Sequence, residues 1–251
     1  MSITQTFYDS LSSHYDKLFL DWTATTREQA VILDRIFRGY GFDKSATVLD
    51  CACGIGTQAI GLAALGYCVT ASDISDAELA EAAKRARENQ VDIRLEHADF
   101  CALSRTFPET FDILICMDNA LPHMLCREDL EKAVESITAR LKENGLFVGS
   151  IRDYDALLRT KPAYAPPYIH KTEKGQRVCF QTWDWEGDRY RLIQYIIEDD
   201  GALHTDRFAC EYRATRREEL TGLFEAAGCR SVRWLMPEQT GFYQPIIMAR
   251  K

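Results

Sequence analysis

The sequence lacks the segments that carry a protein into or across a membrane. No stretch approaches the roughly 20 consecutive apolar residues that a transmembrane helix needs. Residues 1–16 (MSITQTFYDSLSSHYD) have neither the basic start nor the apolar centre of a secretory signal. We therefore expect a cytoplasmic protein with no membrane partner. Hydrophobic residues make up 46% of the 251 positions, enough for a sizeable core.

Clusters of basic residues are also missing. The chain has 30 lysines and arginines against 38 aspartates and glutamates, which gives a formal net charge of -8. The basic residues are dispersed on predicted helix faces, as in residues 84–89 (KRAREN) and 213–219 (RATRREE). Proteins that bind nucleic acids cluster lysine and arginine to neutralise phosphates, so we expect no nucleic-acid partner.

The nine cysteines lack the spacing of a metal site. The only close pair is Cys51 and Cys53, and no second pair at zinc spacing follows it. We therefore expect no metal ion, and cysteines that are reduced, small and buried.

The first part of the chain alternates between strand and helix patterns. Two helices are predicted ahead of this alternation, over Thr4–Leu20 and from about Thr25 to Tyr40. Strands are then predicted at Thr47–Asp50, Tyr67–Ala71, Asp92–Glu96, Phe111–Cys116 and Leu146–Ile151, with helices at Gln58–Leu65, Ser75–Asn89 and Glu128–Leu141. Strands that alternate with helices indicate right-handed crossovers, a parallel sheet and a doubly wound α/β domain.

The pattern changes after Ile151. Residues 161–171 (KPAYAPPYIHK) contain three prolines and are predicted to form a loop. Alternating residues with two turn signals then predict three antiparallel strands, followed by a helix at Arg216–Ala227 and two closing strands. We divide the chain into an N-terminal helical lid (residues 1–45), a core (46–151 and 214–251) and a β insertion (152–213).

One turn has the composition of a ligand-binding loop. The stretch VLDCACGIGTQ (residues 48–58) joins the first strand of the alternation to a helix, where open parallel sheets bind ligands. Gly54 and Gly56 let backbone approach a ligand closely, but Gly61 is misplaced for the dinucleotide pattern G-x-G-x-x-G. Asp50 precedes these glycines, and a carboxylate there repels a pyrophosphate and suits a cationic ligand.

Two further acids follow the second and third strands. Asp73 ends the second strand, where an acid accepts hydrogen bonds from ribose hydroxyls. Asp99 follows the third strand and can accept one from an adenine amine, with the backbone of Phe100 nearby and Ile74 able to pack on the adenine face. Together with the acid before the glycines, these residues indicate S-adenosylmethionine, which joins an adenosine to a sulfonium and an ammonium.

Several stretches resemble class I S-adenosylmethionine-dependent methyltransferases, and more narrowly the glycine and sarcosine N-methyltransferase branch. The matching stretches are YDSLSSHYDKLFLDW, VLDCACGIGTQ, HADF, MDNALPH, IRDYDALL and FYQPIIMARK. The resemblance implies a seven-stranded, mostly parallel, Rossmann-like methyltransferase sheet with an antiparallel last strand. It also implies an enzyme that moves a methyl group to a small-molecule acceptor, namely the amine of an amino-acid-like substrate of the glycine or sarcosine type.

The resemblance assigns residues to the cofactor. Tyr15, Trp22 and Arg27 correspond to lid residues that close over the methionine end, where the arginine pairs with the cofactor carboxylate. Asp73, Ile74, Asp99 and Phe100 are also expected to bind the cofactor. The remaining expected cofactor-binding residues are Asp50, Ala52, Gly54, Gly56, Gln58, Met117 and His123.

On the acceptor side, the resemblance implies Asn119 and Arg152, with Arg152 holding a substrate carboxylate. Tyr168 is expected there as well, because it is one of several aromatic residues in the β insertion, of which alternate members should line the acceptor mouth. The structural alternative for Arg152 is an ion pair with Asp153 or Asp155.

Methyl transfer from a sulfonium is an in-line displacement, so the protein mainly aligns donor and acceptor and excludes water. Tyr15 and His123 are the residues expected at the reacting atoms, and His123 is the first candidate for a base if one is needed. The alternative for His123 is a structural histidine that forms a hydrogen bond with the lid backbone.

Other functions stay open because the chain departs from its close relatives between Lys161 and Tyr190, where the acceptor pocket is built. The main alternative is an O- or N-methyltransferase of a larger natural product or an aromatic small molecule. Nucleic-acid methylation is disfavoured, since MDNALPH stands where base methylases carry an N-P-P-[YF]-like stretch. A non-catalytic protein would bind the cofactor without transferring its methyl group. We expect a monomer or a homodimer.

Overall fold

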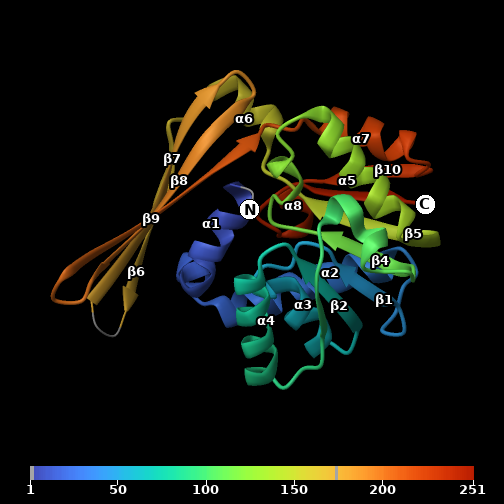
Figure 1. The fold of residues 1–251 in the computed structure, drawn as a ribbon, viewed down its shortest axis with the longest axis horizontal. Coiled ribbons are helices and arrows are strands. Elements are labelled where there is room, and N and C mark those ends of the chain that lie inside the picture. The colour runs from blue at the N-terminus through green and yellow to red at the C-terminus, as the bar shows by residue number, and fades with distance from the viewer. Residues whose placement is uncertain (1–2, 173–174) are drawn as a thin grey trace.

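The computed structural model describes residues 3–172 and 175–251, and its larger sheet has seven strands (Figure 1). The strands lie in the order β10-β11-β5-β4-β1-β2-β3, and β11 is antiparallel to both of its neighbours. Their bounds are β1 Thr47–Asp50, β2 Cys68–Asp73, β3 Arg94–His97, β4 Phe111–Cys116, β5 Leu141–Ser150, β10 Ser231–Leu235 and β11 Ile246–Arg250. This arrangement confirms the predicted doubly wound α/β fold with an antiparallel last strand.

Helices cover both faces of the seven-stranded sheet. The helices are α1 Ile3–Leu11, η1 Ser12–Leu18, α2 Trp22–Gly39, α3 Thr57–Ala64, α4 Asp76–Glu88, η2 Phe100–Arg105, η3 Leu121–His123, α5 Arg127–Ala139, α6 Tyr154–Thr160, α7 Arg217–Ala226 and α8 Pro237–Thr240. Val48 and Ile113 pack in a core cluster with residues of α2 and α3. Leu49 and Leu114, one position along each strand, pack with residues of α5 and α7. This alternation follows from the two-residue period of a strand.

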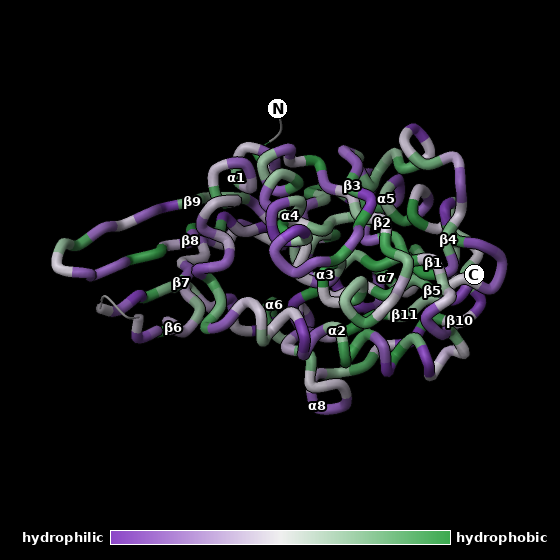
Figure 2. Tube along the Cα trace, turned by 90° about the horizontal axis from the view of Figure 1, so that it is seen from below, coloured by the Kyte–Doolittle hydropathy of each residue, from purple (hydrophilic) through white to green (hydrophobic). Residues whose placement is uncertain are grey.

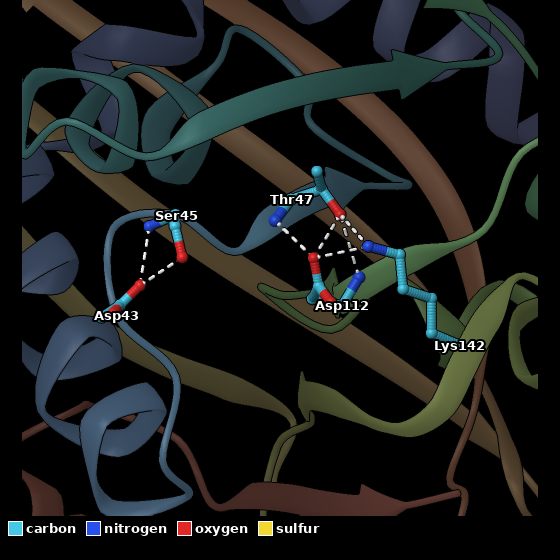
Figure 3. A network of polar contacts seen from close by, with 5 residues as sticks. All are labelled: Asp43, Ser45, Thr47, Asp112 and Lys142. Carbon is cyan, nitrogen blue, oxygen red and sulfur yellow. Dashed lines mark hydrogen bonds and ion pairs between the residues drawn. The ribbon is translucent and has the colours of Figure 1, made fainter.

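At the amino ends of the strands, polar contacts join three neighbours (Figure 3). The Asp112 carboxylate in β4 accepts hydrogen bonds from the backbone nitrogen and hydroxyl of Thr47 in β1, at 2.8 and 2.7 Å, and from Lys142 Nζ in β5 at 2.8 Å. Ahead of β1, Asp43 accepts from the backbone nitrogen and hydroxyl of Ser45. The predicted ligand-binding loop, which follows Asp50, lies at the opposite, carboxyl end of β1.

A second sheet of four antiparallel strands extends away from the core (Figures 1 and 2). Its strands are β6 Tyr164–Thr172, β7 Gly175–Glu186, β8 Arg189–Asp199 and β9 Leu203–Arg213, in that order across the sheet. Tyr190 and Tyr212, which pair across β8 and β9, pack in the same core cluster as α5 and α7. The root of the second sheet is therefore anchored on the core.

The predicted proline-rich loop at residues 161–171 is wrong, because most of it belongs to β6. β6 is an edge strand, and an edge strand tolerates proline because one side of its backbone needs no partner. Pro166 and Pro167 fall where the pairing register shifts, between Ala165 and Tyr168. The second sheet accordingly has four strands rather than the three predicted.

The N-terminal segment lies between the two sheets, with α1 against β9 and α4 (Figure 1). The single helix predicted over Thr4–Leu20 is instead α1 followed by η1. The Ser12 hydroxyl donates to the carbonyl of Asp9, a local bond that competes with continued α-helix. The next helix, α2, begins earlier than predicted because the Asp21 carboxylate accepts from the Ala24 nitrogen and caps it.

Within the described part of the chain, no helix combines the length and apolar character that crossing a membrane requires. Among the same residues, no three histidine, cysteine, aspartate or glutamate side chains gather as metal ligands. Cys51 and Cys53 are free thiols buried in separate apolar clusters.

Candidate active site

A cavity of about 590 Å³ lies at the carboxyl ends of the sheet strands, under α1 and η1. Of the residues predicted to bind the cofactor, ten line it: Tyr15, Ala52, Gly54, Gln58, Asp73, Ile74, Asp99, Phe100, Met117 and His123. The four other predicted residues, Trp22, Arg27, Asp50 and Gly56, lie outside its lining. The sequence rule that ligands bind beyond strand ends thus locates the cavity.

The loop between β1 and α3 is shaped for close approach to a ligand. Gly54 and Gly56 have φ angles of +51° and +88°, which residues with a side chain rarely adopt. Gly56 is the N-cap residue of α3. The Asp73 carboxylate ties the loop to β2, because it accepts hydrogen bonds from the backbone nitrogens of Gly54 at 2.9 Å and Ser75 at 3.0 Å. A carboxylate has about four acceptor positions, so Asp73 keeps capacity for ligand hydroxyls.

Two buried acids lie behind this loop with carboxylate oxygens that accept no hydrogen bond from the described residues. Asp50 Oδ2 and both carboxylate oxygens of Glu78 have no hydrogen-bond partner among the described residues. Glu78 lies directly behind Gly54, where a Cβ would meet its Oε2 at 3.5 Å. Burial raises the pKa of Asp50 to about 8 and raises that of Glu78 well above its usual range. This surplus of buried acceptors fits a cationic, hydroxyl-bearing ligand such as S-adenosylmethionine.

Two predicted lid residues sit on α2, outside the cavity lining. Trp22 is buried and donates from Nε1 to the Thr57 hydroxyl at 3.0 Å, with the Arg85 guanidinium over its ring. Trp22 therefore fixes α2 to the first turn of α3. Arg27 is exposed on the same helix, and its pairing with a cofactor carboxylate stays a prediction.

His123 lies at the cavity wall in an apolar setting. Its Nε2 is 3.0 Å from the Tyr8 hydroxyl, and its ring lies 4.2 Å from the ring of Tyr212. Burial, helped by the nearby charge of Arg152, lowers the pKa of His123 to about 3, against the effect of a hydrogen bond with the Glu211 backbone. The imidazole is therefore neutral near pH 7. These contacts join η3 to α1 and β9, and the hydrogen bond to α1 is made to a side-chain hydroxyl rather than to the lid backbone of the structural alternative.

A second cavity, of about 710 Å³, lies between the core and the second sheet. Tyr8, Tyr15 and Asp118 line both cavities, which places these residues at their junction. Arg152 and Tyr168 line the second cavity, as predicted for acceptor-side residues.

Asn119 lines neither cavity. It is buried, and its Oδ1 accepts hydrogen bonds from the Arg152 backbone nitrogen and the Tyr154 hydroxyl, both at 3.0 Å. These contacts place Asn119 behind Arg152, as a support for the backbone there.

Arg152 points into the second cavity without a carboxylate partner. Its Nη1 donates to the Tyr190 hydroxyl at 2.6 Å and its Nη2 donates to Gln181 Oε1 at 3.1 Å. The guanidinium also lies 5.0 Å from the ring centre of Trp183. Among residues 3–172 and 175–251, no aspartate or glutamate forms an ion pair with Arg152.

The alternative ion pairs considered for Arg152 are made by another arginine. Arg217 binds Asp153 at 2.6 Å and Asp155 at 3.1 Å. Those two acids are therefore satisfied from α7, and Arg152 is left with neutral partners.

Asp118 is a site residue that the sequence analysis missed. It follows β4, and its carboxylate accepts hydrogen bonds from the Tyr243 hydroxyl at 2.7 Å and Gln58 Nε2 at 2.8 Å. Burial raises its pKa, against the effect of these two bonds. The rule that singled out acids after the first three strands applies equally to Asp118 in MDNALPH, so the signal was present in the sequence.

Comparison with known proteins agrees with this geometry. A methyltransferase domain family matches residues 48–145. Glycine/sarcosine N-methyltransferase of Parasynechococcus marenigrum is 28% identical over 217 residues, which cover 85% of this chain and 73% of the relative. Glycine N-methyltransferase of Homo sapiens is 32% identical over 160 residues, covering 59% of this chain and 52% of the relative.

Solved structures share the fold. An amino pentose methyltransferase from Micromonospora echinaspora superposes with a TM-score of 0.76 at 21% identity, covering 90% of this chain and 91% of the other. A methyltransferase from Clostridium acetobutylicum gives 0.73 at 19% identity and covers 97% of both chains. At such identities the likeness extends to the fold alone.

Proposed function

We propose that this chain, which is a class I S-adenosylmethionine-dependent methyltransferase, methylates the nitrogen of a small amine that carries a carboxylate. The observation that carries the proposal is the Arg152 guanidinium, which lines the acceptor cavity and lacks an acidic partner among the described residues. The relatives that cover most of this chain are named for glycine and sarcosine, whose carboxylates would meet this need.

A carboxylate completes the surroundings of Arg152. A guanidinium offers five N–H donors in a planar fork that matches a carboxylate with two parallel hydrogen bonds. Tyr190 and Gln181 use one donor on each terminal nitrogen. Because the rings of Trp183, Tyr190 and Tyr212 surround the guanidinium, an anion gains more from this charge than it would in bulk water.

The first cavity would hold the cofactor by its two ends. Asp73 would accept from the ribose hydroxyls, and Asp99, Ile74 and Phe100 would surround the adenine. Burial raises the pKa of Asp50 to about 8, and the positive charge of a bound cofactor would favour the ionised form of this acid, so that cation and carboxylate stabilise each other. Tyr15 would close the methionine end, since it lies where the two cavities meet.

The bound cofactor supplies a methyl group that its sulfonium already activates. The residues of this chain align the acceptor nitrogen with it and keep water out. A structural role fits His123 better than a role as general base, since a histidine with a pKa of about 3 takes up a proton poorly near pH 7.

A larger acceptor is the second candidate. The acceptor cavity of about 710 Å³ is far larger than glycine needs. An amine on a bulkier, carboxylate-free natural product would fill more of this space and would leave Arg152 without a charged partner.

The proposal is tested by incubating the protein with labelled S-adenosylmethionine and a panel of amino acids, amino sugars and phenols. We expect turnover of glycine or sarcosine, and its loss in Arg152→Ala. Turnover of phenols alone, or of amino sugars without dependence on Arg152, would refute the proposed acceptor class.

A further inference from the structure

We infer that Asp118 receives the ammonium group of the acceptor and removes its proton before methyl transfer. This inference rests on the proposed function and deepens it, because it assigns the other end of a zwitterionic substrate. In the step, an N–H bond of the ammonium breaks and the proton moves to the Asp118 carboxylate. The freed nitrogen pair then forms the bond to the methyl carbon, while the carbon–sulfur bond breaks and its electron pair stays on sulfur.

The position of Asp118 fits this role. It follows β4 at the carboxyl edge of the sheet and lines both the cofactor cavity and the acceptor cavity. A methyl group that passes from one cavity to the other crosses this junction. Tyr8 and Tyr15 share the junction, but a carboxylate is the stronger acceptor for a proton near pH 7.

The charge of Asp118 has no counter-charge in an ion pair within residues 3–172 and 175–251. Tyr243 and Gln58 donate one hydrogen bond to each carboxylate oxygen, and both donors are neutral. Among the residues that the structure describes, Asp118 forms no ion pair with lysine, arginine or histidine. A cation from outside is the partner that this carboxylate needs.

Asp118 and Arg152 make a pair of opposite charges on the acceptor cavity. Their backbones are held together, because the Asn119 nitrogen donates to the Ser150 carbonyl at 3.0 Å and the Arg152 nitrogen donates to Asn119 Oδ1 at 3.0 Å. The Asp118 nitrogen donates to the Ser150 hydroxyl at 2.8 Å. These hydrogen bonds hold the two charged residues in fixed relative positions, so that an ammonium and a carboxylate of one small molecule can face them.

The backbone at Asp118 is strained for a residue with a side chain. Its φ angle is +55°, and that of Asn119 is +70°. Glycine would adopt this conformation freely, whereas aspartate adopts it at a cost in free energy. Residues that bear such a cost cluster at functional sites. In this conformation the Asp118 side chain lines both cavities.

The protonation equilibrium supports the assignment. Burial raises the pKa of Asp118 above that of an ordinary carboxyl group, which brings it closer to the pKa of an amine. The titratable groups that face it are Tyr243, Tyr15 and Asp50, from three different parts of the chain. All three are neutral or anionic, so none of them competes as its cation.

Asp118→Asn and Asp118→Gly test the inference together, because both remove the charge and both suit a left-handed backbone. The rate is measured from pH 6 to pH 10 with the amine that the wild-type enzyme methylates fastest. We expect kcat/KM for the amine to fall about 100-fold or more at pH 7 in both variants. The loss should shrink as pH rises, since solvent then deprotonates the amine.

A binding readout separates Asp118 from the cofactor residues. Calorimetry with S-adenosylhomocysteine should give both variants a Kd within about twofold of the wild type. A loss of this affinity as large as the loss of rate would make Asp118 a cofactor residue and overturn the inference. Parallel pH profiles for variants and wild type would overturn it too.

The two proposals fail in different ways. If glycine turnover depends on Arg152 but is unchanged in both Asp118 variants, only the inference about Asp118 is wrong. If the enzyme methylates only phenols, the proposed acceptor class is wrong, and the role of Asp118 fails with it because no ammonium is present.

Discussion

The guanidinium of Arg152 is oriented by two glutamine amides. Gln194 Nε2 donates to the backbone carbonyls of Phe180 and Tyr195, at 3.1 and 2.9 Å, which fixes the direction of its amide. Its Oε1 then accepts from Gln181 Nε2 at 2.9 Å. As a result, Gln181 Oε1 faces Arg152 Nη2. The second sheet thus sets the direction of the charge predicted to hold the substrate carboxylate.

Gln181→Glu should weaken acceptor binding, because it places a carboxylate on Arg152 that competes with the substrate. We expect KM for glycine or sarcosine to rise roughly 10- to 100-fold, as for loss of a hydrogen bond to a charged group. Affinity for S-adenosylhomocysteine should not change. The control is Gln176→Glu, an exposed position in the same strand. An unchanged KM in Gln181→Glu would contradict the claim that Arg152 binds the carboxylate of the acceptor.

At the residue scale, the sequence predicted side chains whose position follows from a strand end. Nine of the ten predicted residues that line the first cavity, among them Asp73 and Asp99, lie at or after the carboxyl ends of β1 to β4, and the tenth, Tyr15, lies in η1. Gln181 could not be predicted in the same way, because its role depends on a chain of hydrogen bonds across β7 and β8. Whether each lining residue binds the cofactor stays a prediction.

At the scale of elements, α2 approaches α3 at a glycine. A Cβ on Gly61 would lie 2.6 Å from the Thr26 carbonyl oxygen and 2.8 Å from the Ala30 Cβ. The glycine that seemed misplaced for a dinucleotide loop therefore serves helix packing. Its position matters to the site, since α3 begins at the cofactor loop.

Gly61→Ala should destabilise the protein by roughly 1–3 kcal/mol, because the two helices must separate to admit the methyl group. Chemical denaturation measures the effect. The control is Gly222→Ala in α7, where nothing lies within 4 Å of an added Cβ. That change should stabilise by about 0.5–1 kcal/mol, as alanine favours helix over glycine. Equal effects at the two positions would contradict the packing account.

The elements themselves were predictable to different degrees. Strands of the core were found because they are buried apolar runs that alternate with helices, as at Phe111–Cys116. β6 was missed because its two prolines are a loop signal in isolation. Only its place at the edge of a sheet makes them acceptable, and that place is a property of the tertiary structure.

At the scale of the whole molecule, buried acids make stability depend on pH. The pKa of Asp50 is about 8 in the folded protein, above the roughly 3.9 of an unfolded aspartate. Its contribution to stability is therefore intact below pH 4 and is lost as pH rises towards 8. Burial raises the pKa values of Glu78 and Asp73 as well, so they act in the same direction.

The free energy of unfolding of the ligand-free protein should therefore fall between pH 5 and pH 8. One such acid contributes a slope of at most about 1.4 kcal/mol per pH unit. Denaturation at several pH values measures the slope, and Asp50→Asn should reduce it. S-adenosylmethionine should stabilise the protein more at pH 8 than at pH 5, because its positive charges then meet ionised acids. A slope that is the same in Asp50→Asn and the wild type would contradict this reading.

The central claim is that the acceptor carries a carboxylate and that Arg152 binds it. The most direct test is the ratio of kcat/KM for glycine to that for glycinamide, expressed per unprotonated amine, in the wild type and in Arg152→Gln. Our account predicts that the wild type prefers glycine by roughly 10- to 100-fold and that the variant loses this preference. A wild type that methylates both amines equally well, or a variant that keeps the preference, would contradict it.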